Sequence, residues 1–307
     1  MTRLAILGLG LIGGSVVQAL AARGPDGWTT TAWSRSPASP RLALEAGILT
    51  AVANDPVAAA AEAELTVLAA SPLANIGLVG RVGPAVASAG GLLTDVTSVQ
   101  SPIATAAAAV PGLRMVGGHP MSGRERQGYA AASPDLFVDR PWVVVPGPRA
   151  TPDDIDLVER LARDCGARPI RLDAETHDAA VALISHLPLV VACALVEAAA
   201  AAQGWPVARA LGAQGWRDTT RLARGDPALG AGMLALNAAN VAEALRQQRA
   251  VLDAWQVRLD ALAARRPGKG DADAGVPDMD ALLDELERVA ALADGEGSEP
   301  GEGSGGG

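Results

Sequence analysis

Short apolar runs alternate with segments of helical pattern over the first 172 residues. Such runs, bounded by turn residues, indicate buried strands. Their alternation with helices predicts a parallel sheet that binds ligands at the carboxyl ends of its strands. We expect strands at residues 4–7, 28–33, 65–70, 91–94, 143–145 and 168–172. The first helix is expected to end near residue 23, and further helices are expected at residues 41–46, 56–63, 74–87 and 152–165.

The pattern becomes helical beyond this point, with long apolar helices expected at residues 174–202 and 233–262. We therefore predict an α/β fold. A Rossmann-type, doubly wound parallel sheet would form the N-terminal domain (1–148), and an all-helical C-terminal domain (149–265) would follow. Residues 266–307 are acidic and rich in glycine, which predicts a linker and a mostly disordered tail, with one short helix at 279–292.

The first strand runs directly into the glycine turn Gly8–Gly13. A strand, a G-x-G-x-x-G turn and a helix start, in that order, form the dinucleotide-binding fingerprint. Gly8 would permit the tight turn, Gly10 would let the backbone approach a pyrophosphate, and Gly13 would let helix and strand pack closely. The free N–H groups of the first helical turn, which begins with Leu11 and Ile12, would face the phosphates. An ordinary glycine-rich turn is the alternative.

The end of the second predicted strand bears on the choice of cofactor. Chains that bind NAD usually have Asp or Glu there for the ribose 2′-hydroxyl, whereas this chain has Ser34, Arg35 and Ser36. Two hydroxyls and a guanidinium suit a phosphate, which favours NADP and leaves NAD possible. The alternative is a polar turn before Pro37. Ser71 ends a later strand and is also expected to face the cofactor.

Composition narrows the class of protein. The net charge of −9 comes from residues 271–307, which hold eleven acids and one base, so the first 270 residues carry +1. No basic excess indicates nucleic acid. No uncharged apolar run reaches the ~20 residues that span a bilayer. A signal peptide is not expected, because no cationic region stands ahead of a longer apolar one. With Cys165 and Cys193 as the only cysteines, a cytoplasmic protein is expected.

Basic residues are almost all arginine, and Lys269 is the single lysine. This excludes dehydrogenases that use a Tyr-x-x-x-Lys pair, because Ser133 follows the one tyrosine, Tyr129, at that spacing. It also excludes β-hydroxyacid dehydrogenases, which need a catalytic lysine. Acid–base chemistry is left to the three histidines or to a carboxylate.

His119 and Ser98 are the candidate catalytic residues. His119 stands among glycines and before Pro120, which restricts its backbone to an extended conformation. Ser98 could be a helix N-cap, but Ser101, followed by proline, is expected to cap that helix, which leaves Ser98 available for the site.

Five motifs follow one another along the chain: Gly8–Ser15, Thr94–Gln100, Gly117–Gly128 with Asp135–Phe137, Ser185–Pro188 and Gly215–Arg221. In these motifs and their spacing the chain resembles the prephenate and arogenate dehydrogenases of tyrosine biosynthesis. The resemblance covers about residues 1–260 and is nearest to the arogenate-type branch that uses NADP. Two departures are Gln100, where the family has a lysine, and Gln127, where it has a serine.

The resemblance implies oxidative decarboxylation of prephenate or arogenate, with hydride transfer to NADP or NAD and no metal. It implies that His119 is the base and that Ser98 shares the substrate hydroxyl. His186, Arg221, Arg217 and Glu125 would bind the substrate. The helices of the C-terminal domain would form a homodimer, although their amphipathic pattern would equally fit the core of a monomer.

Helix geometry adds two expectations. Nine residues at ~100° each place His177 and His186 on opposite faces of a straight helix, so at most one would face a given pocket. His177 is then expected to be a surface or hydrogen-bonding residue, and Pro188 could kink the helix. Arg217 and Arg221 are four apart and would share a helical face, either as substrate anchors or in a solvated pair with Asp218.

Two other functions remain open. The chain could be another two-domain NADP enzyme that acts on small acids or imines, or a non-catalytic protein that senses nucleotides.

Overall fold

The computed structural model describes residues 1–24, 27–124, 126–264 and 280–294. The chain divides into two compact units, residues 1–245 and 246–307, and each is described by itself. Of the expected linker and tail at 266–307, residues 266–279 and 295–307 lie outside the described residues.

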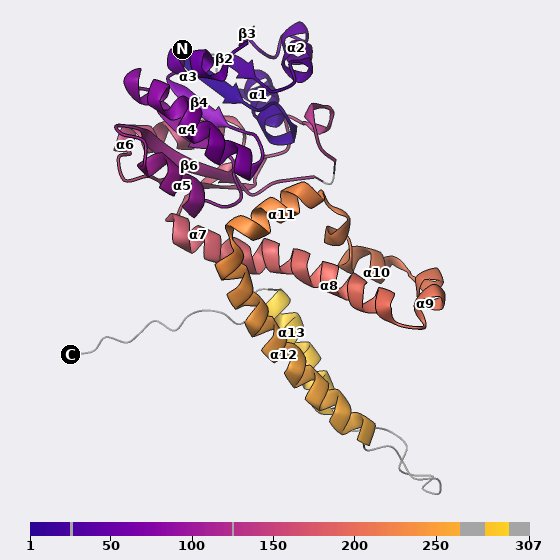
Figure 1. Ribbon diagram of the computed structural model, residues 1–307. Coiled ribbons are helices and arrows are strands. Elements are labelled where there is room, and N and C mark those ends of the chain that lie inside the picture. Colours follow the sequence, from indigo (N-terminus) through magenta and orange to yellow (C-terminus); the bar gives the residue numbers. More distant parts are fainter. Residues whose placement is uncertain (25–26, 125, 265–279, 295–307) are drawn as a thin grey trace, which may run out of the picture. The chain divides into compact units, whose positions relative to one another are not determined.

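An eight-stranded sheet is the centre of the first unit, with the strand order β3-β2-β1-β4-β5-β6-β7-β8 (Figure 1). Neighbours from β3 to β6 pair in parallel, β7 pairs antiparallel with β6, and β8 pairs in parallel with β7. The strands are β1 (Thr2–Leu7), β2 (Trp28–Trp33), β3 (Ala51–Val52), β4 (Leu65–Leu68), β5 (Leu92–Asp95), β6 (Arg114–Pro120), β7 (Pro141–Pro146) and β8 (Arg168–Arg171).

Helices cover both faces of this sheet. Side chains of α1, α2 and α6 join one buried apolar cluster, and side chains of α3, α4 and α5 join another on the opposite face. The doubly wound fold expected from the sequence is thus confirmed. These elements are α1 (Leu11–Arg23), α2 (Ala38–Glu45), α3 (Pro56–Glu62), α4 (Pro72–Ser88), α5 (Ser101–Ala108), the 3₁₀ turn η1 (Tyr129–Ala131) and α6 (Pro152–Asp164).

The sheet continues past residue 148, where the sequence predicts a domain limit. A capping box starts α6 just beyond that limit: the Thr151 hydroxyl accepts a hydrogen bond from the Asp154 N–H, and the Asp154 carboxylate accepts one from the Thr151 N–H. After α6 the chain returns to the sheet as β8. The expected limit therefore lies inside the sheet.

The rest of the first unit is helical. Its helices are α7 (Ala174–Val181), the single π-helical turn η2 (Ala182–His186), α8 (Leu187–Ala201), α9 (Trp205–Leu211), α10 (Gln214–Thr219), the 3₁₀ turn η3 (Leu222–Arg224), α11 (Pro227–Leu236) and the start of α12 (Ala238–Ala264). The single helix expected at 233–262 is interrupted at Asn237, which ends α11.

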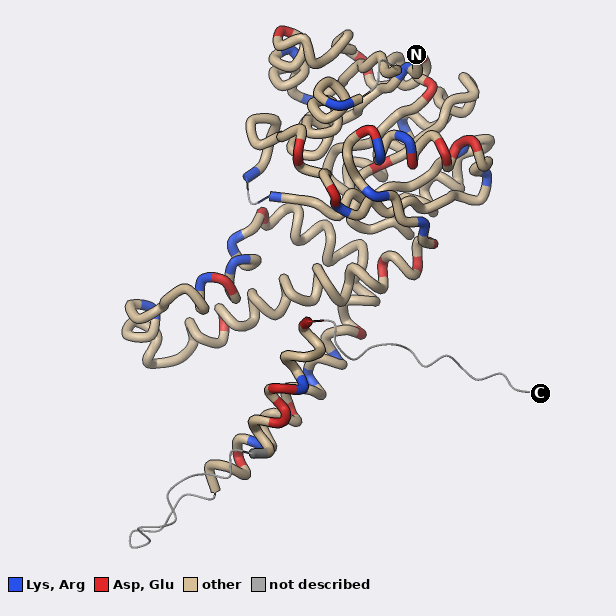
Figure 2. The backbone as a smooth tube through the Cα atoms, turned by 180° about the vertical axis from the view of Figure 1, so that it is seen from behind, with Lys and Arg blue, Asp and Glu red and all other residues tan. Residues whose placement is uncertain are grey.

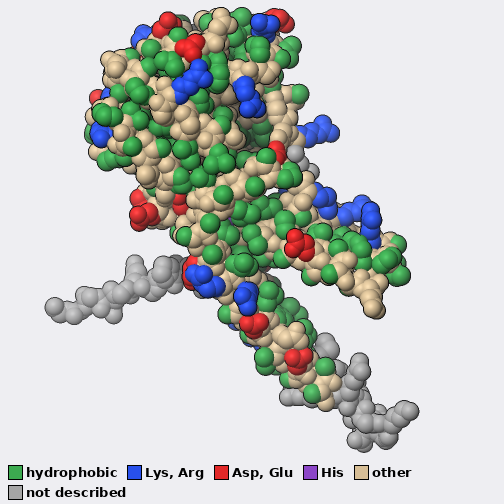
Figure 3. Space-filling view, in the orientation of Figure 1, with side chains coloured by type: hydrophobic (Ala, Val, Ile, Leu, Met, Phe, Trp, Pro, Cys, Tyr) green, Lys and Arg blue, Asp and Glu red, His purple; other side chains and the backbone are tan. Residues whose placement is uncertain are grey.

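The helical stretch of α7, η2 and α8 is strongly apolar, yet little of it is buried. Leu183 and Ile184 are 51% and 68% exposed. By length and composition alone, Ala174–Ala201 could cross a membrane, with 22% of its most apolar window buried. Apolar side chains gather on this part of the surface in Figure 3.

The second unit contains the remainder of α12 and the helix α13 (Asp280–Ala293). The Arg258 Nη2 lies 3.3 Å from Glu285 Oε1, so an ion pair joins the two helices. The short helix expected at 279–292 is confirmed.

Candidate active site

The glycine turn between β1 and α1 leaves open space where a phosphate group would lie. Gly8 has a φ of +115°, and a Cβ there would lie 2.6 Å from the backbone of Ala69. A Cβ on Gly13 would lie 2.1 Å from the Gly8 carbonyl oxygen, whereas a Cβ on Gly10 would meet nothing within 4 Å. No side chain caps α1, so the N–H groups of Leu11 and Ile12 remain available at its positive end. The turn therefore fits a pyrophosphate.

The residues expected around the adenosine end lie beside this turn. The Ser34 hydroxyl accepts a hydrogen bond of 3.2 Å from the Leu9 N–H, so Ser34 shapes the glycine turn itself. Arg35 and Ser36 are exposed and follow β2, and Ser71 is exposed at the start of α4.

A chain of hydrogen bonds runs from His119, near the end of β6, to α7. His119 Nδ1 lies 2.9 Å from His177 Nε2, and His177 Nδ1 lies 2.8 Å from Asp178 Oδ1. His177 is buried and hydrogen-bonded, not a surface residue. The sequence does not place His177 or Asp178 at the site, although a histidine next to an aspartate is a signal of an imidazole–carboxylate pair.

Asp178 also closes the N-terminus of α5. Its carboxylate oxygens accept hydrogen bonds from the N–H groups of Gln100 at 2.7 Å and Ser101 at 2.8 Å. The expectation that Ser101 caps α5 is wrong, because Gln100 holds the cap position and makes no side-chain cap. A carboxylate from α7 satisfies these N–H groups instead, and the helix dipole favours its charge.

These contacts determine which nitrogen atoms carry protons. Burial pushes the pKa of Asp178 up, but hydrogen bonds from His177, Gln100 and Ser101 outweigh it and the pKa is lowered. The ionised carboxylate can only accept, so His177 donates through Nδ1 and its Nε2 accepts from His119 Nδ1. His119 Nε2 is thereby left with a lone pair.

His119 is neutral over a wide pH range. Burial, followed by the neighbouring His177 and His186, lowers its pKa to about 3, and Asp178 opposes this only in part. A neutral ring offers the Nε2 lone pair at neutral pH, and the lowered pKa makes it a weaker base than a free imidazole.

His186 lies in the same cluster, at the end of η2. Its Nδ1 is 3.1 Å from Asn237 Nδ2, whose N–H groups also donate to the Asp178 carbonyl oxygen. The expectation that His177 and His186 lie on opposite faces of a straight helix fails, because the π-helical turn winds more widely than an α-turn and changes the angle between them. The break at Asn237 places an amide against His186.

The buried carboxyl group of Asp95 connects the segments that carry His119 and Ser98. Asp95 accepts hydrogen bonds from the N–H groups of Thr97 and Gly118 at 2.8 and 3.1 Å, and from Gln100 Nε2 at 3.3 Å. It thus holds both the loop that carries Ser98 and the strand that carries His119. Burial raises its pKa to about 7, although those hydrogen bonds oppose the rise.

Two further side-chain atoms at this site make no hydrogen bond within the described parts of the chain. These are the buried Ser98 Oγ and His186 Nε2. Since Asn237 donates to His186 Nδ1, the proton of a neutral His186 lies on Nε2. One hydroxyl and one N–H are therefore available to a ligand.

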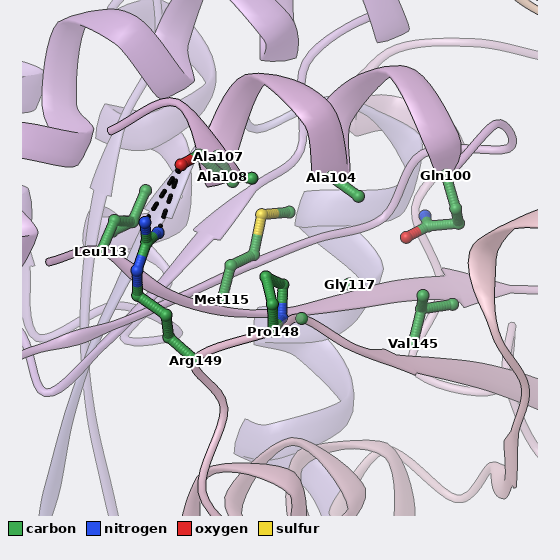
Figure 4. Close-up of a pocket in the computed structure, with 11 residues that line it drawn as sticks. Gln100, Ala104, Ala107, Ala108, Leu113, Met115, Gly117, Val145, Pro148 and Arg149 are labelled. Carbon is green, nitrogen blue, oxygen red and sulfur yellow. Dashed lines mark hydrogen bonds between the residues drawn. The ribbon is translucent and has the colours of Figure 1, made fainter. Parts of the chain in front are cut away.

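A small cavity behind the site does not belong to it. It has a volume of about 10 Å³ and lies between α5 and the strands β6 and β7 (Figure 4). Alanine, leucine, methionine and valine side chains line most of it, and Gln100 lies at one end. A space of this size holds about one water molecule and no substrate.

A larger cavity, of about 490 Å³, is bounded by three arginines. Arg124 and Arg126 come from the loop after β6, and Arg221 comes from the residue before η3. Arg217 does not line it, because α10 ends at Thr219 and the expected shared helical face does not form. Glu125 lies outside the described residues.

No group of three His, Cys, Asp or Glu side chains within the described ranges could hold a metal ion.

Comparison with known families matches nearly the whole described chain. The family model "Prephenate dehydrogenase, nucleotide-binding domain" matches residues 16–171, and "Prephenate dehydrogenase, dimerization domain" matches residues 173–263. The first match runs through β8, the last strand of the sheet.

Curated and solved relatives carry related names. A prephenate dehydrogenase from Bacillus subtilis is 29% identical over 73% of this chain, which spans only 61% of that relative. A cyclohexadienyl dehydrogenase from Zymomonas mobilis is 31% identical over 74% of this chain and 78% of the relative. The crystal structure of the Synechocystis arogenate dehydrogenase is 26% identical, with a TM-score of 0.73 over 96% of this chain and 98% of that one.

Proposed function

This chain belongs to the prephenate dehydrogenase family, and from that premise we propose that it oxidises prephenate or arogenate with a nicotinamide cofactor and releases CO₂. The observation that carries the proposal is the hydrogen-bonded chain from Asp178 through His177 to His119. It leaves a neutral imidazole in the domain that has the dinucleotide-binding turn.

The residues proposed to hold the cofactor are those of the glycine turn and the ends of β2 and β4. The N–H groups that follow Gly10 would bind the pyrophosphate. Arg35, with Ser34 and Ser36, would bind a 2′-phosphate, which favours NADP over NAD. When bound, the nicotinamide supplies the acceptor for the hydride that leaves the substrate.

His119 would act as the general base. Its Nε2 accepts a hydrogen bond from the hydroxyl of the substrate ring. It takes the hydroxyl proton as hydride leaves the ring carbon that bears this hydroxyl. The bond between the ring and its carboxylate then breaks, CO₂ departs, and the electron pair completes the aromatic ring. Protonated His119 returns the proton to the phenolate oxygen. Asp178 balances the transient positive charge through His177.

Ser98 and His186 would help to hold the substrate. The Ser98 hydroxyl can share the ring hydroxyl with His119, and the His186 Nε2–H can donate to a substrate oxygen. Arg221 would bind a carboxylate through its planar guanidinium. Arg217 and Glu125 remain proposed contacts of the substrate, as the resemblance implies.

We further propose a homodimer formed by the helices of residues 173–263. Two observations support it: the match to a dimerization domain and the exposed apolar surface of η2 and α8. Almost all of α8 carries no charge in Figure 2, so a second copy could cover it with little desolvation of charged groups. Burial against protein also accounts for its apolar character without a membrane.

The test is a steady-state assay of the purified full chain with both substrates crossed with both cofactors. We expect turnover of at least one cyclohexadienyl substrate, and a higher kcat/KM with NADP than with NAD. Turnover of small imines or hydroxy acids, with neither prephenate nor arogenate used, would favour the alternative of another two-domain NADP enzyme. Cofactor binding without any turnover would favour a nucleotide sensor.

A further inference from the structure

Side chains connect β5 and β6 next to the proposed base, beyond the residues at which the two strands pair. That pairing joins Leu92 and Leu93 of β5 to the start of β6. Further along, the Gly118 N–H donates to Asp95 Oδ1 at 3.1 Å, and the Gly118 carbonyl oxygen accepts from Gln100 Nε2 at 3.1 Å. Gly118 directly precedes His119, so these two side chains hold the backbone at the base.

The same amide of Gln100 binds the loop that carries Ser98. Its Nε2 lies 2.9 Å from the Thr97 carbonyl oxygen and 3.3 Å from Asp95 Oδ2. The amide nitrogen must face these oxygens, because an amide oxygen in its place could only accept. Gln100 Oε1 makes no hydrogen bond within the described parts of the chain. One NH₂ group therefore joins the residue before Ser98 to the residue before His119.

Strand β6 leaves room for this amide. Gln100 is fully buried, and its side chain points from the start of α5 towards the strand that carries Gly117 (Figure 4). A Cβ on Gly117 would overlap with Gln100 Oε1. The amide can lie across the strand because a glycine stands there.

The main chain of Gln100 is connected to the ring of His119. The Gln100 N–H donates to Asp178 Oδ1 at 2.7 Å. Asp178 accepts from His177, whose Nε2 accepts from the His119 ring. The circuit closes through the Gly118 carbonyl oxygen, which accepts from the Gln100 amide. The ring and the backbone of His119 are thus both fixed relative to one residue.

We infer that Gln100 is a positioning residue, which holds Ser98 and His119 so that both meet one hydroxyl of the substrate. This inference rests on the proposed function. Because Gln100 is fully buried, it acts on the reaction through these two residues. A displacement of about 1 Å at reacting groups can cost about 10²-fold in rate. Loss of the amide contacts should therefore lower kcat and leave cofactor binding in place.

The experiment compares the full chain with Gln100→Met, which keeps a side chain of similar length and removes both N–H donors. With the substrate and cofactor that the wild type uses, we expect kcat to fall ~10–100-fold. The dissociation constant of the cofactor should change less than about threefold. Gln100→Lys again offers N–H donors to the three oxygens, and should keep kcat within about threefold of the wild type.

Asp154→Ala is the control for a loss of stability. Asp154 is buried, takes part in the capping box of α6 and pairs with Arg114, at the opposite end of β6 from His119. This variant should lower the midpoint of urea unfolding and leave kcat unchanged.

A double variant separates positioning from a purely structural role. In the His119→Asn background no base remains to be positioned, so Gln100→Met should change kcat less than about threefold. An equal loss in both backgrounds would mean that Gln100 only supports the fold, and would overturn the inference.

Other outcomes separate the inference from the proposed function. A wild-type kcat in Gln100→Met would overturn the inference and leave the proposed function intact. A loss of about tenfold or more in a folded Gln100→Lys would also overturn it, and this test holds even where Gln100→Met does not fold. No turnover of either substrate by the wild type would contradict the proposed function, and this inference with it.

Discussion

At the scale of single residues, the proton states of His119 and Asp95 distinguish this site from free side chains. The buried Asp95 carboxylate accepts from the Gly118 N–H, and the half-buried His119 ring donates to His177. Burial penalises the charged form, so it lowers the pKa of the imidazole and raises that of the carboxyl. The low pKa of His119 predicts activity that persists in acid, and the raised pKa of Asp95 predicts stability that falls as the pH rises.

The activity should persist in mildly acidic solution. Only neutral His119 accepts a proton, and with a pKa of about 3 it stays neutral well below pH 6. kcat/KM should therefore be nearly constant from pH 8 to pH 5. A base with the ordinary pKa of ~6.5 would lose about 30-fold by pH 5.

The measurement is the pH profile of kcat/KM, with circular dichroism at each pH to confirm that the chain stays folded. An acid limb with its midpoint near pH 6.5 would show that His119 is not shielded as described.

The Asp95 carboxyl should make folding less favourable as the pH rises. Its folded pKa of about 7 is above the value of 3.8 for an unperturbed group, so the folded state binds the proton more tightly. The stabilisation is fully present below pH 3.8 and is lost as the pH rises through 7.

Asp95→Asn removes this titration. Between pH 5 and pH 8 the free energy of unfolding of the wild type should fall by about 2–3 kcal/mol relative to the variant, measured by urea titration. A difference between the two proteins that does not change with pH would contradict the raised pKa.

At the scale of elements, α5, α7 and η2 bring the site together. Asp178 on α7 both accepts from His177 and closes the N-terminus of α5. A helix contact and a contact of the proposed catalytic chain therefore share one carboxylate.

Asp178→Asn tests this dual role. The amide NH₂ would face an N–H that now donates to the carboxylate, so one buried donor loses its acceptor. We expect a loss of about 1–3 kcal/mol in the free energy of unfolding and at least a tenfold loss in kcat.

The control is Asp173→Ala, because Asp173 caps α7 on the exposed side through the Thr176 N–H. It should cost about 1 kcal/mol of stability and leave kcat unchanged. Equal effects of both variants on kcat would mean that Asp178 has only a structural role.

The sequence predicts most elements because apolar runs and proline or glycine boundaries act locally. The expected bounds of 28–33 are those of β2, and the alternation of strands and helices predicts the doubly wound sheet. The local signal fails at the π-helical turn and at Asn237, because an α-helical pattern continues through both positions and tertiary contacts decide the break. The expected cap by Ser101 fails for the same reason, since its replacement comes from 77 residues away.

Sequence motifs single out several residues of the candidate site but not the hydrogen bonds that join them. His119, Ser98 and the glycine turn stand out by their neighbours in sequence. His177, Asp178 and Asp95 do not, because their role comes from hydrogen bonds to residues remote in the chain. Sequence reasoning therefore proposes the reacting groups but misses the network that orients them.

At the scale of the whole molecule, the apolar helices of residues 173–263 predict association in solution. We expect the purified chain to have the mass of a dimer by light scattering, because a second copy would cover η2 and the exposed part of α8. Ile184→Glu, at a residue 68% exposed in the single chain, should shift the mass towards a monomer. Leu42→Glu on α2, 57% exposed and outside residues 173–263, serves as the control and should leave the mass unchanged. A monomeric wild type would contradict the proposed homodimer.

The central claim is that His119 is the base of a dehydrogenase. The most direct measurement is the turnover number of His119→Asn with the substrate and cofactor that the wild type uses, alongside the dissociation constant of the cofactor. The account predicts a loss of ~10²–10⁴ in kcat with cofactor binding retained. A variant that turns over at nearly the rate of the wild type would contradict it.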